Sequence, residues 1–209
     1  MTSTNSNYTI YGGGICLSNS DATVTENLIS GNKCRTGAGI FVGSSEPFIA
    51  DNIISGNNGL SIYSVGGAAS SFGAGLYCGN SGGIITRNAF TGNGIPVSGG
   101  AAIYLSDSGT TCEFSNNILY SNPSTRVIRC VSSAAPMIVN NTLFAEGSSV
   151  AINIDTSGAS VVNNIIANSG TYGITESTSG TDPITVAFNL FFNNGIGLYK
   201  DEGNTTISS

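Results

Sequence analysis

Two short stretches, Asn27-Leu28-Ile29-Ser30-Gly31-Asn32 and Asn52-Ile53-Ile54-Ser55-Gly56-Asn57, share one phrase: an asparagine, two apolar residues, two small residues and a second asparagine. By subtraction, successive copies begin 25, 36, 29, 24, 23 and 25 residues apart. An internal repeat of this length is typical of stacked architectures. The basic period is about two dozen residues, and the later copies begin at Asn88, Asn117, Asn141, Asn164 and Asn189.

A second phrase precedes the first by about a dozen residues, as Gly-Gly-Gly-Ile at 12–15, Gly-Ala-Gly-Ile at 37–40 and Gly-Ala-Gly-Leu at 73–76. Both phrases lie in short, alternating apolar runs separated by Gly, Asn and Ser, which indicates several short strands per repeat and no helix. Such strands bury their apolar sides when successive coils stack about 4.8 Å apart. We therefore predict an all-β parallel β-solenoid of roughly 7–8 coils, about 24 residues per coil, as a single domain over 1–209.

Columns of equivalent residues identify the expected interior, because alternate residues of a strand point to the same side. The repeated asparagine fits a turn that needs left-handed backbone geometry, with its side-chain amide stacked on the next coil. Two inward columns are expected in the first six coils: Ile15, Ile40, Leu76, Ile103, Ile128 and Ile152, continued by Ile174 and Leu198, and Leu17, Val42, Cys78, Leu105, Cys130 and Ile154. A third inward column is Val24, Ile49, Ile85, Phe114, Ile138, Val161 and Val186.

The phrases Gly-Gly-Gly-Ile-Cys at 12–16, Asn-Leu-Ile-Ser-Gly-Asn at 27–32 and Asn-Ile-Ile-Ser-Gly-Asn at 52–57 resemble the right-handed parallel β-helix repeats of the pectate-lyase-like superfamily. The resemblance covers essentially the whole chain. It implies a right-handed β-helix in a secreted or cell-surface protein, with polysaccharide bound on the outer face of one sheet. It does not select a function, since this superfamily includes lyases, hydrolases, epimerases, phage tailspikes and adhesins.

Composition excludes several kinds of chemistry. The 209 residues include 6 Lys and Arg, 12 Asp and Glu and no His, for a net charge of −6. Without histidine there is no Ser-His-Asp triad and no His-ligated zinc site. Six scattered cations supply no patch for phosphates, so nucleic acid is not expected as a partner. The sequence contains no apolar run of 18 residues, so no membrane span is predicted, and residues 1–8 show no signal peptide.

One outward column of the expected solenoid holds the candidate ligand-binding residues. Three aromatic side chains in consecutive coils, Phe41, Tyr77 and Tyr104, are followed by Arg129 and Asn153. Sugar rings pack on aromatic faces, and Arg129 could hold a uronate carboxylate. Alternatively, the rings pack under an inserted loop at 58–72, where the 36-residue interval exceeds the usual period by 11. That loop is either a wall of the binding surface or simple decoration.

The column immediately before each repeated asparagine supplies the only catalytic suspects, Glu26, Asp51 and Arg87. Two carboxylates one coil apart would lie near the separation found in retaining glycosidases. Acidic ladders of this kind also bind Ca²⁺. The alternative is an exposed Asp51/Arg87 ion pair beside a solvated Glu26, and this is the interpretation that we favour. We assign no catalytic residue, no metal ligand and no cofactor.

Five cysteines, at 16, 34, 78, 112 and 130, give an odd count, so at least one thiol is free. Cys78 and Cys130 share an inward column two coils apart, too far for a disulfide. They are expected to be small core residues, and no pairing is predicted for the other three.

Three functions remain open from sequence. The favoured one is an extracellular or cell-surface β-helix module that binds carbohydrate, or adheres, through the outer face of one sheet. The second is a polysaccharide lyase or glycoside hydrolase, or part of one, acting on an acidic polysaccharide. The third is a purely structural stalk or spacer. Neither end shows a capping helix, so neighbouring domains or self-association are expected at the uncapped ends.

Overall fold

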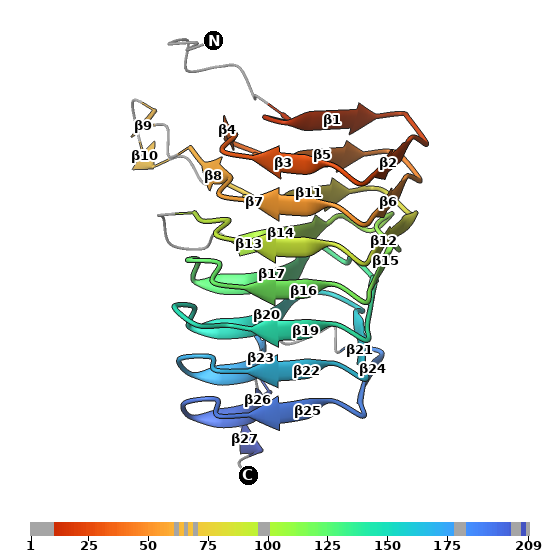
Figure 1. The fold of residues 1–209 in the computed structure, drawn as a ribbon. Helices are drawn as coiled ribbons and strands as arrows, with labels where there is room; N and C mark the ends of the chain where they lie inside the picture. Colours follow the sequence, from red (N-terminus) through yellow and green to blue (C-terminus); the bar gives the residue numbers. More distant parts are fainter. Residues whose placement is uncertain are drawn as a thin grey trace.

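The computed structural model describes residues 11–60, 63–64, 67–68, 71–95, 101–177, 183–201 and 206–207. The chain winds into a column of stacked coils, with the first and last described strands at opposite ends (Figure 1). Equivalent asparagines such as Asn27 and Asn52 are 25 residues apart. Two of the sheets contain seven strands each. These features confirm the predicted right-handed parallel β-helix, with about seven turns.

Three sheets run the length of the column, and in each one a strand pairs with its equivalents in the coils above and below (Figure 1). Sheet 1 contains β1 (Ile15–Ser18), β5 (Ile40–Gly43), β11 (Leu76–Gly79), β14 (Ala101–Ser106), β17 (Arg126–Val131), β20 (Val150–Asp155), β23 (Tyr172–Glu176), β26 (Gly197–Lys200) and β27 (Thr206–Ile207). Sheet 2 contains β2 (Thr23–Thr25), β6 (Phe48–Ala50), β12 (Ile84–Thr86), β15 (Glu113–Ser115), β18 (Met137–Val139), β21 (Ser160–Val162) and β24 (Thr185–Ala187). Sheet 3 contains β3 (Leu28–Ser30), β7 (Ile53–Ser55), β13 (Ala89–Thr91), β16 (Ile118–Tyr120), β19 (Thr142–Phe144), β22 (Ile165–Ala167) and β25 (Leu190–Phe192).

Two small pairs of strands lie outside the three sheets. β4 (Lys33–Cys34) pairs in parallel with β8 (Asn58–Gly59), so the first residues of the predicted 58–72 insertion still belong to the coil. β9 (Tyr63–Ser64) and β10 (Gly67–Ala68) pair antiparallel. Phe72 then pairs with Thr36 and returns the chain to the solenoid. Residues 61–62, 65–66 and 69–70 of the predicted insertion lie outside the described residues.

The interior follows the predicted columns through most of the solenoid. Ile40, Leu76 and Ile103 are in register and fully buried. The third column is also in register from Val24 to Val186. Cys78 and Cys130 are buried in the core as predicted, and the five cysteines are free thiols. No helix that could span a membrane occurs in the part of the chain that the structure describes.

The last coil departs from the predicted columns by one residue. Leu198 was assigned to the inward column and Tyr199 to the outward one, but the register pairs Ile174 with Tyr199 and Thr175 with Lys200. Tyr199 therefore packs against the core. Ile174 and its strand partner are one residue further apart in the sequence than the Gly-x-Gly-aliphatic phrase suggested. That phrase alone does not fix the register of strand pairing.

The repeated asparagines form a hydrogen-bonded ladder through the turn between sheets 2 and 3. The backbone N–H and side-chain Nδ2 of Asn52 both donate to Oδ1 of Asn88, each at 3.0 Å. The predicted stacking is confirmed, but the left-handed backbone lies one residue earlier, at Glu26, Asp51 and Arg87, with φ of 58°, 60° and 53°. Because the preceding residue makes the corner, the side-chain amide of each repeated asparagine can point inward. A second ladder joins Asn32, Asn57, Asn93 and Asn122.

Candidate functional site

Three aromatic side chains in the outward column of sheet 1, Phe41, Tyr77 and Tyr104, stack on one another, and we call them the aromatic ladder. Strand register aligns these three residues on β5, β11 and β14. The Phe41 and Tyr77 rings stack with centroids 5.3 Å apart, and the Tyr77 and Tyr104 rings stack at 5.9 Å. The Arg129 guanidinium lies 5.7 Å from the Tyr104 ring centroid, in a cation–π arrangement. The predicted alignment of the three aromatic residues is therefore present.

Glycines on the same strands make room for the ladder. A Cβ atom on Gly43 would lie 2.8 Å from the Phe41 ring, and one on Gly79 would lie 2.8 Å from the Tyr77 ring. Residues two apart on a strand face the same side, so each ring lies over the glycine that follows it. The third coil has Ser106 at the equivalent position. The two glycines thus set the position of the rings along the strands.

The flat faces of the ladder rings are already occupied. Phe41 stacks on Tyr77 and has Tyr11 at 4.5 Å on another side, while Tyr104 contacts Phe72 at 4.8 Å. Only 9% of Phe41 and 8% of Tyr104 remain exposed. A sugar ring therefore cannot stack face to face within the ladder, and contact would be with ring edges. The alternative prediction, that the rings pack under the inserted loop, matches the contact of Phe72 with Tyr104.

A groove of about 360 Å³ runs beside the first two rings of the ladder. The glycine positions 43 and 79 form part of its lining, and polar residues surround them. Tyr77 Oη lies 3.5 Å from Oδ2 of Asp107. Burial, and next the negative charge of Asp107, raise the pKa of Tyr77 to about 12. The polar side chains lining the groove are Ser18, Ser44, Tyr77, Asn80 and Asp107.

Sequence reasoning did not identify Ser44, Asn80 or Asp107 as site residues. All three have left-handed backbones, with φ of 49°, 49° and 76°, at the corner after sheet 1. Ser, Asn and Asp are common at such corners, so their sequence signal is that of an ordinary turn. The recurrence of a polar corner residue just after the aromatic strands could have marked them as neighbours of the ladder.

The other two predicted ligand-binding residues lie further along the same column. Arg129 donates from Nη2 to Oδ2 of Asp155 at 2.8 Å, so its positive charge is paired with a carboxylate of the same protein. Asn153 is 1% exposed and donates to Thr175 Oγ1 at 3.0 Å and to Ser177 Oγ at 2.7 Å. Burial, and next the charge of Arg129, lower the pKa of Arg126 on the same strand. Neither Arg129 nor Asn153 lines the groove, and their binding role stays a prediction.

The three catalytic suspects lie apart from the ladder, at the corner before sheet 3. Arg87 holds Asp51 through two hydrogen bonds, Nε to Oδ1 at 2.8 Å and Nη2 to Oδ2 at 2.6 Å. This bonding lowers the pKa of Asp51. Both partners are exposed, as is Glu26. The arrangement is the exposed ion pair that we favoured, and among the described residues no three His, Cys, Asp or Glu side chains are placed to hold a metal ion.

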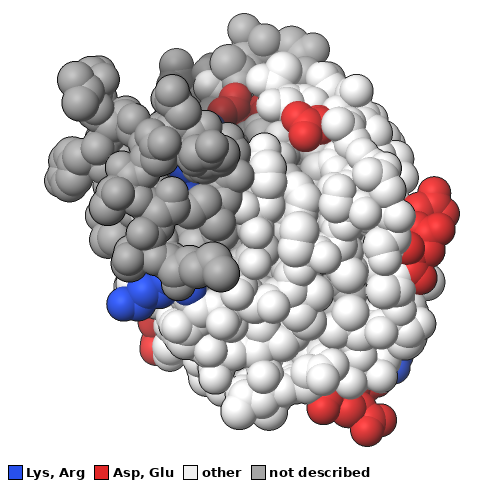
Figure 2. All heavy atoms as spheres, turned by 90° about the horizontal axis from the view of Figure 1, so that it is seen from above, with Lys and Arg blue, Asp and Glu red and all other residues white. Residues whose placement is uncertain are grey.

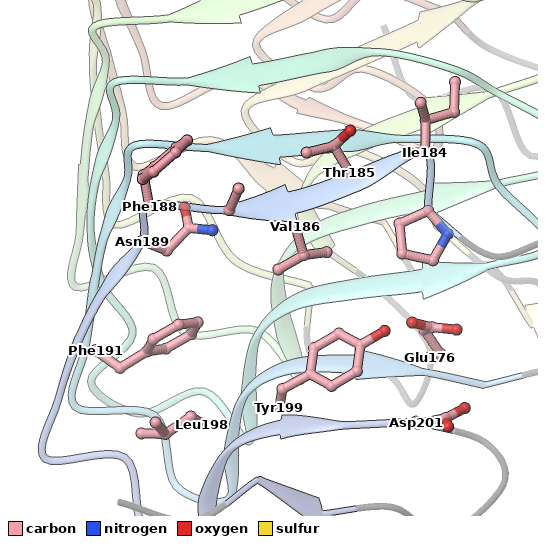
Figure 3. A pocket seen from close by; sticks show the side chains of 12 residues that line it. Glu176, Ile184, Thr185, Val186, Phe188, Asn189, Phe191, Leu198, Tyr199 and Asp201 are labelled. Atoms are coloured by element: carbon pink, nitrogen blue, oxygen red, sulfur yellow. The ribbon is translucent and has the colours of Figure 1, made fainter.

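A larger hollow of about 590 Å³ opens at the C-terminal end of the solenoid (Figure 3). Its lining includes Val186, Phe191 and Tyr199, whose side chains continue the interior columns, and the carboxylates of Glu176 and Asp201. No residue predicted from sequence to bind a ligand lies in this hollow. It lies against the last described residues of the core, whereas the groove beside the ladder lies on the outer face of sheet 1.

Comparison with known proteins supports the fold. The family model described as "Right handed beta helix region" matches residues 2–143 and again residues 68–209. A search of curated proteins finds no match. Among solved structures, HetL, a pentapeptide repeat protein involved in heterocyst differentiation regulation in the cyanobacterium Nostoc sp. strain PCC 7120, aligns over 92% of each chain. The identity is 8% and the TM-score 0.20, values that carry no argument.

Proposed function

Because this chain belongs to the right-handed β-helix family, we propose that it is an extracellular or cell-surface module that binds carbohydrate through the outer face of sheet 1. The extracellular setting rests on the resemblance of its repeats to those of secreted and surface proteins. Attachment to a glycan would make the module an adhesive element of its parent surface.

The observation that carries the proposal is the groove beside Phe41 and Tyr77. It combines aromatic edges, a backbone floor at Gly43 and Gly79, and side chains that donate or accept hydrogen bonds. Carbohydrate sites need this mixture, because a sugar presents C–H surface on one side and hydroxyl groups around its rim.

Charge favours a neutral ligand. Asp107 is the ionisable acid that lines the groove, and its carboxylate would accept hydrogen bonds from sugar hydroxyls. A uronate would instead bring a second negative charge towards Asp107, in a protein with a net charge of −6. Arg129, which sequence analysis offered as the uronate partner, is bonded to Asp155. We therefore propose a neutral polysaccharide as the ligand class.

Affinity electrophoresis in gels containing neutral β-glucan, galactomannan or xyloglucan, with polygalacturonate as the acidic comparison, tests this proposal. Two substitutions address the groove: Asp107→Asn, which suits a left-handed backbone, and Tyr77→Leu. The matched control for the second is Tyr120→Leu, since Tyr120 is exposed on sheet 3. We expect a neutral polymer to retard the wild type and the control but not the groove variants.

Two outcomes would overturn the proposal. Equal retardation of the wild type and both groove variants would place the binding surface elsewhere. A wild type that migrates unretarded through the neutral and acidic gels would favour a structural stalk. Release of new reducing ends from any of the polymers would instead support the enzymatic alternative.

A further inference from the structure

Three cysteines from three consecutive coils lie together inside the solenoid. Cys78 and Cys130 face inward from sheet 1, and strand register places Leu105 of the intervening coil between them. Cys112 belongs to that intervening coil and directly precedes β15. All three cysteine side chains are fully buried in the main hydrophobic core. The carbohydrate-binding proposal uses none of them.

The backbone brings Cys112 close to the coil that carries Cys78. Ser81 lies in the turn that leaves sheet 1 after Cys78, and its Oγ donates to Gly79 O at 2.8 Å within that turn. The N–H of Thr111 donates to Ser81 O at 3.1 Å, which joins this turn to the next coil. Cys112, the residue after Thr111, therefore stacks on the turn that follows Cys78.

The two thiols of this pair contact each other directly. Cys78 and Cys112 form a side-chain hydrogen bond, whereas Cys112 influences Cys130 only through an electrostatic interaction. A disulfide requires two side chains that point towards each other on neighbouring segments of backbone. The contact between Cys78 and Cys112 meets this requirement, so the pair can be joined with little movement of the two coils.

The folded protein protects both thiols from oxidation. The hydrogen bond with Cys112, and next burial, raise the pKa of Cys78 well above its usual range. Viewed down the axis, the centre of the coloured part of the molecule shows no charged side chain (Figure 2). A cysteine attacks a disulfide as its thiolate, and this form is disfavoured in a buried, uncharged interior. Oxidation of the pair therefore has to occur before the surrounding coils close.

We propose that Cys78 and Cys112 become joined by a disulfide when the chain folds in the presence of a small disulfide such as oxidised glutathione. One cysteine thiolate attacks a sulfur of the glutathione disulfide, breaks its S–S bond and releases one glutathione thiolate. The other cysteine thiolate attacks the protein sulfur of this mixed disulfide and releases the second glutathione thiolate. Two protein thiols are thus oxidised, one glutathione disulfide is reduced, and the two protons pass to the released thiolates. The structure shows the reduced form.

The cross-link stabilises the part of the solenoid that carries the aromatic ladder. Cys78 follows Tyr77 on β11, and the coil of Cys112 carries Tyr104 on β14. By subtraction, the two cysteines are 34 residues apart. A cross-link over this separation restricts the unfolded chain and should raise the thermal midpoint by about 5–15 °C. The inference is independent of carbohydrate binding, because neither cysteine lines the groove.

Refolding the full chain from urea in a buffer of oxidised and reduced glutathione tests the proposal. Free thiols are then blocked with iodoacetamide in denaturant, and the protein is digested with trypsin. Cleavage after Arg87 and Arg126 places the three clustered cysteines on three different peptides. We expect mass spectrometry to find the Cys78 peptide linked to the Cys112 peptide. This linkage should be absent from Cys112→Ala and present in the matched core variant Cys130→Ala.

Two measurements on the wild type complete the test. When the folded, reduced protein is exposed to oxidised glutathione, the exposed Cys16 should gain one glutathione while Cys78 and Cys112 remain thiols. The linked form should melt about 5–15 °C above the reduced form.

Three outcomes would overturn the proposal. They are refolded wild type without the linkage, a linkage of Cys112 to Cys130 instead of Cys78, and a linked form that melts below the reduced form. Linkage in the folded protein as fast as Cys16 reacts would refute the requirement for oxidation during folding. The linkage is read on the wild type, so a variant that fails to fold leaves these outcomes intact.

Discussion

Removing one rung of the asparagine ladder, by Asn88→Ala, should destabilise the protein far more than an ordinary polar substitution. Asn88 is 2% exposed and lies in the middle of the solenoid. Its Nδ2 donates to Ile49 O at 3.0 Å, to Thr86 O at 2.9 Å and to Asn117 Oδ1 at 3.1 Å. Its Oδ1 accepts from the N–H and the Nδ2 of Asn52. The side chain therefore joins three consecutive coils.

The expected loss of stability can be estimated from what remains after truncation. The N–H of Asn52 would be buried without an acceptor, which costs about 1–3 kcal/mol. Thr86 O would keep its bond from the N–H of Asp51, and Asn117 Oδ1 would keep its bond from the N–H of Asn88. The other lost bonds contribute about 0.5–1.5 kcal/mol each when they are not replaced. We expect the free energy of unfolding to fall by about 3–5 kcal/mol, because some partners of the Asn88 side chain keep another hydrogen bond.

Urea unfolding followed by far-ultraviolet circular dichroism measures this change. Asn58→Ala is the matched control, since Asn58 is exposed and lies outside both ladders. Asn189→Ala removes the terminal rung, which is only partly buried, so water can replace its lost bonds and the effect should be smaller. If Asn88→Ala and Asn58→Ala differ by less than about 0.5 kcal/mol, the range usual for surface substitutions, the reasoning about the ladder is wrong.

Four further predictions follow from individual contacts. Ile103→Asp should lower the free energy of unfolding by more than about 4 kcal/mol, because the charge would be buried, whereas Ile118→Asp on the outer face should cost far less in the same urea titration. Gly79→Ala should displace the Tyr77 ring and change the near-ultraviolet circular dichroism, while Gly82→Ala, whose added Cβ has its nearest atom at 3.4 Å, should not. Phe188→Asn should raise the thermal midpoint, with a gain of about 1 kcal/mol, since Asn accepts the left-handed backbone more readily. The Tyr77 phenol titrates at about 12 when folded and near about 10 when unfolded, so its stabilising contribution is complete below the lower value and is lost as pH rises through the higher one. Tyr77→Phe should therefore flatten the alkaline fall of the urea midpoint, and an unchanged slope would contradict the assigned burial of this phenol.

Much of the fold could be predicted because a solenoid brings together residues at a nearly constant separation in sequence. The Asn27, Asn52 and Asn88 phrases mark equivalent places on successive coils, and the residues that flank them fall into columns by counting alone. Inward and outward phase follows from the alternation of side chains along a strand. That is why the interior column from Val24 to Val186 and the alignment of Phe41, Tyr77 and Tyr104 were accessible from the sequence.

The candidate site was less accessible, because its properties depend on which surfaces of a side chain remain open. Sequence placed three rings in a row, but their stacking at 5.3 and 5.9 Å closes their faces to a ligand. Sequence also offered Arg129 as a free cation, whereas Asp155, on the next strand, accepts its hydrogen bond. Phe72 reaches Tyr104 through an insertion whose path has no repeat to count from.

The sequence by itself determined the period, the three inward columns and the stacking of the repeated asparagines, because each depends only on residue type and spacing. Only the tertiary structure decided the register of the last coil, where Tyr199 takes the place expected for Leu198. It also decided that the groove lies beside the aromatic ladder and not on its ring faces. These features arise from contacts between side chains of different coils, whose orientation and packing no column of residues records.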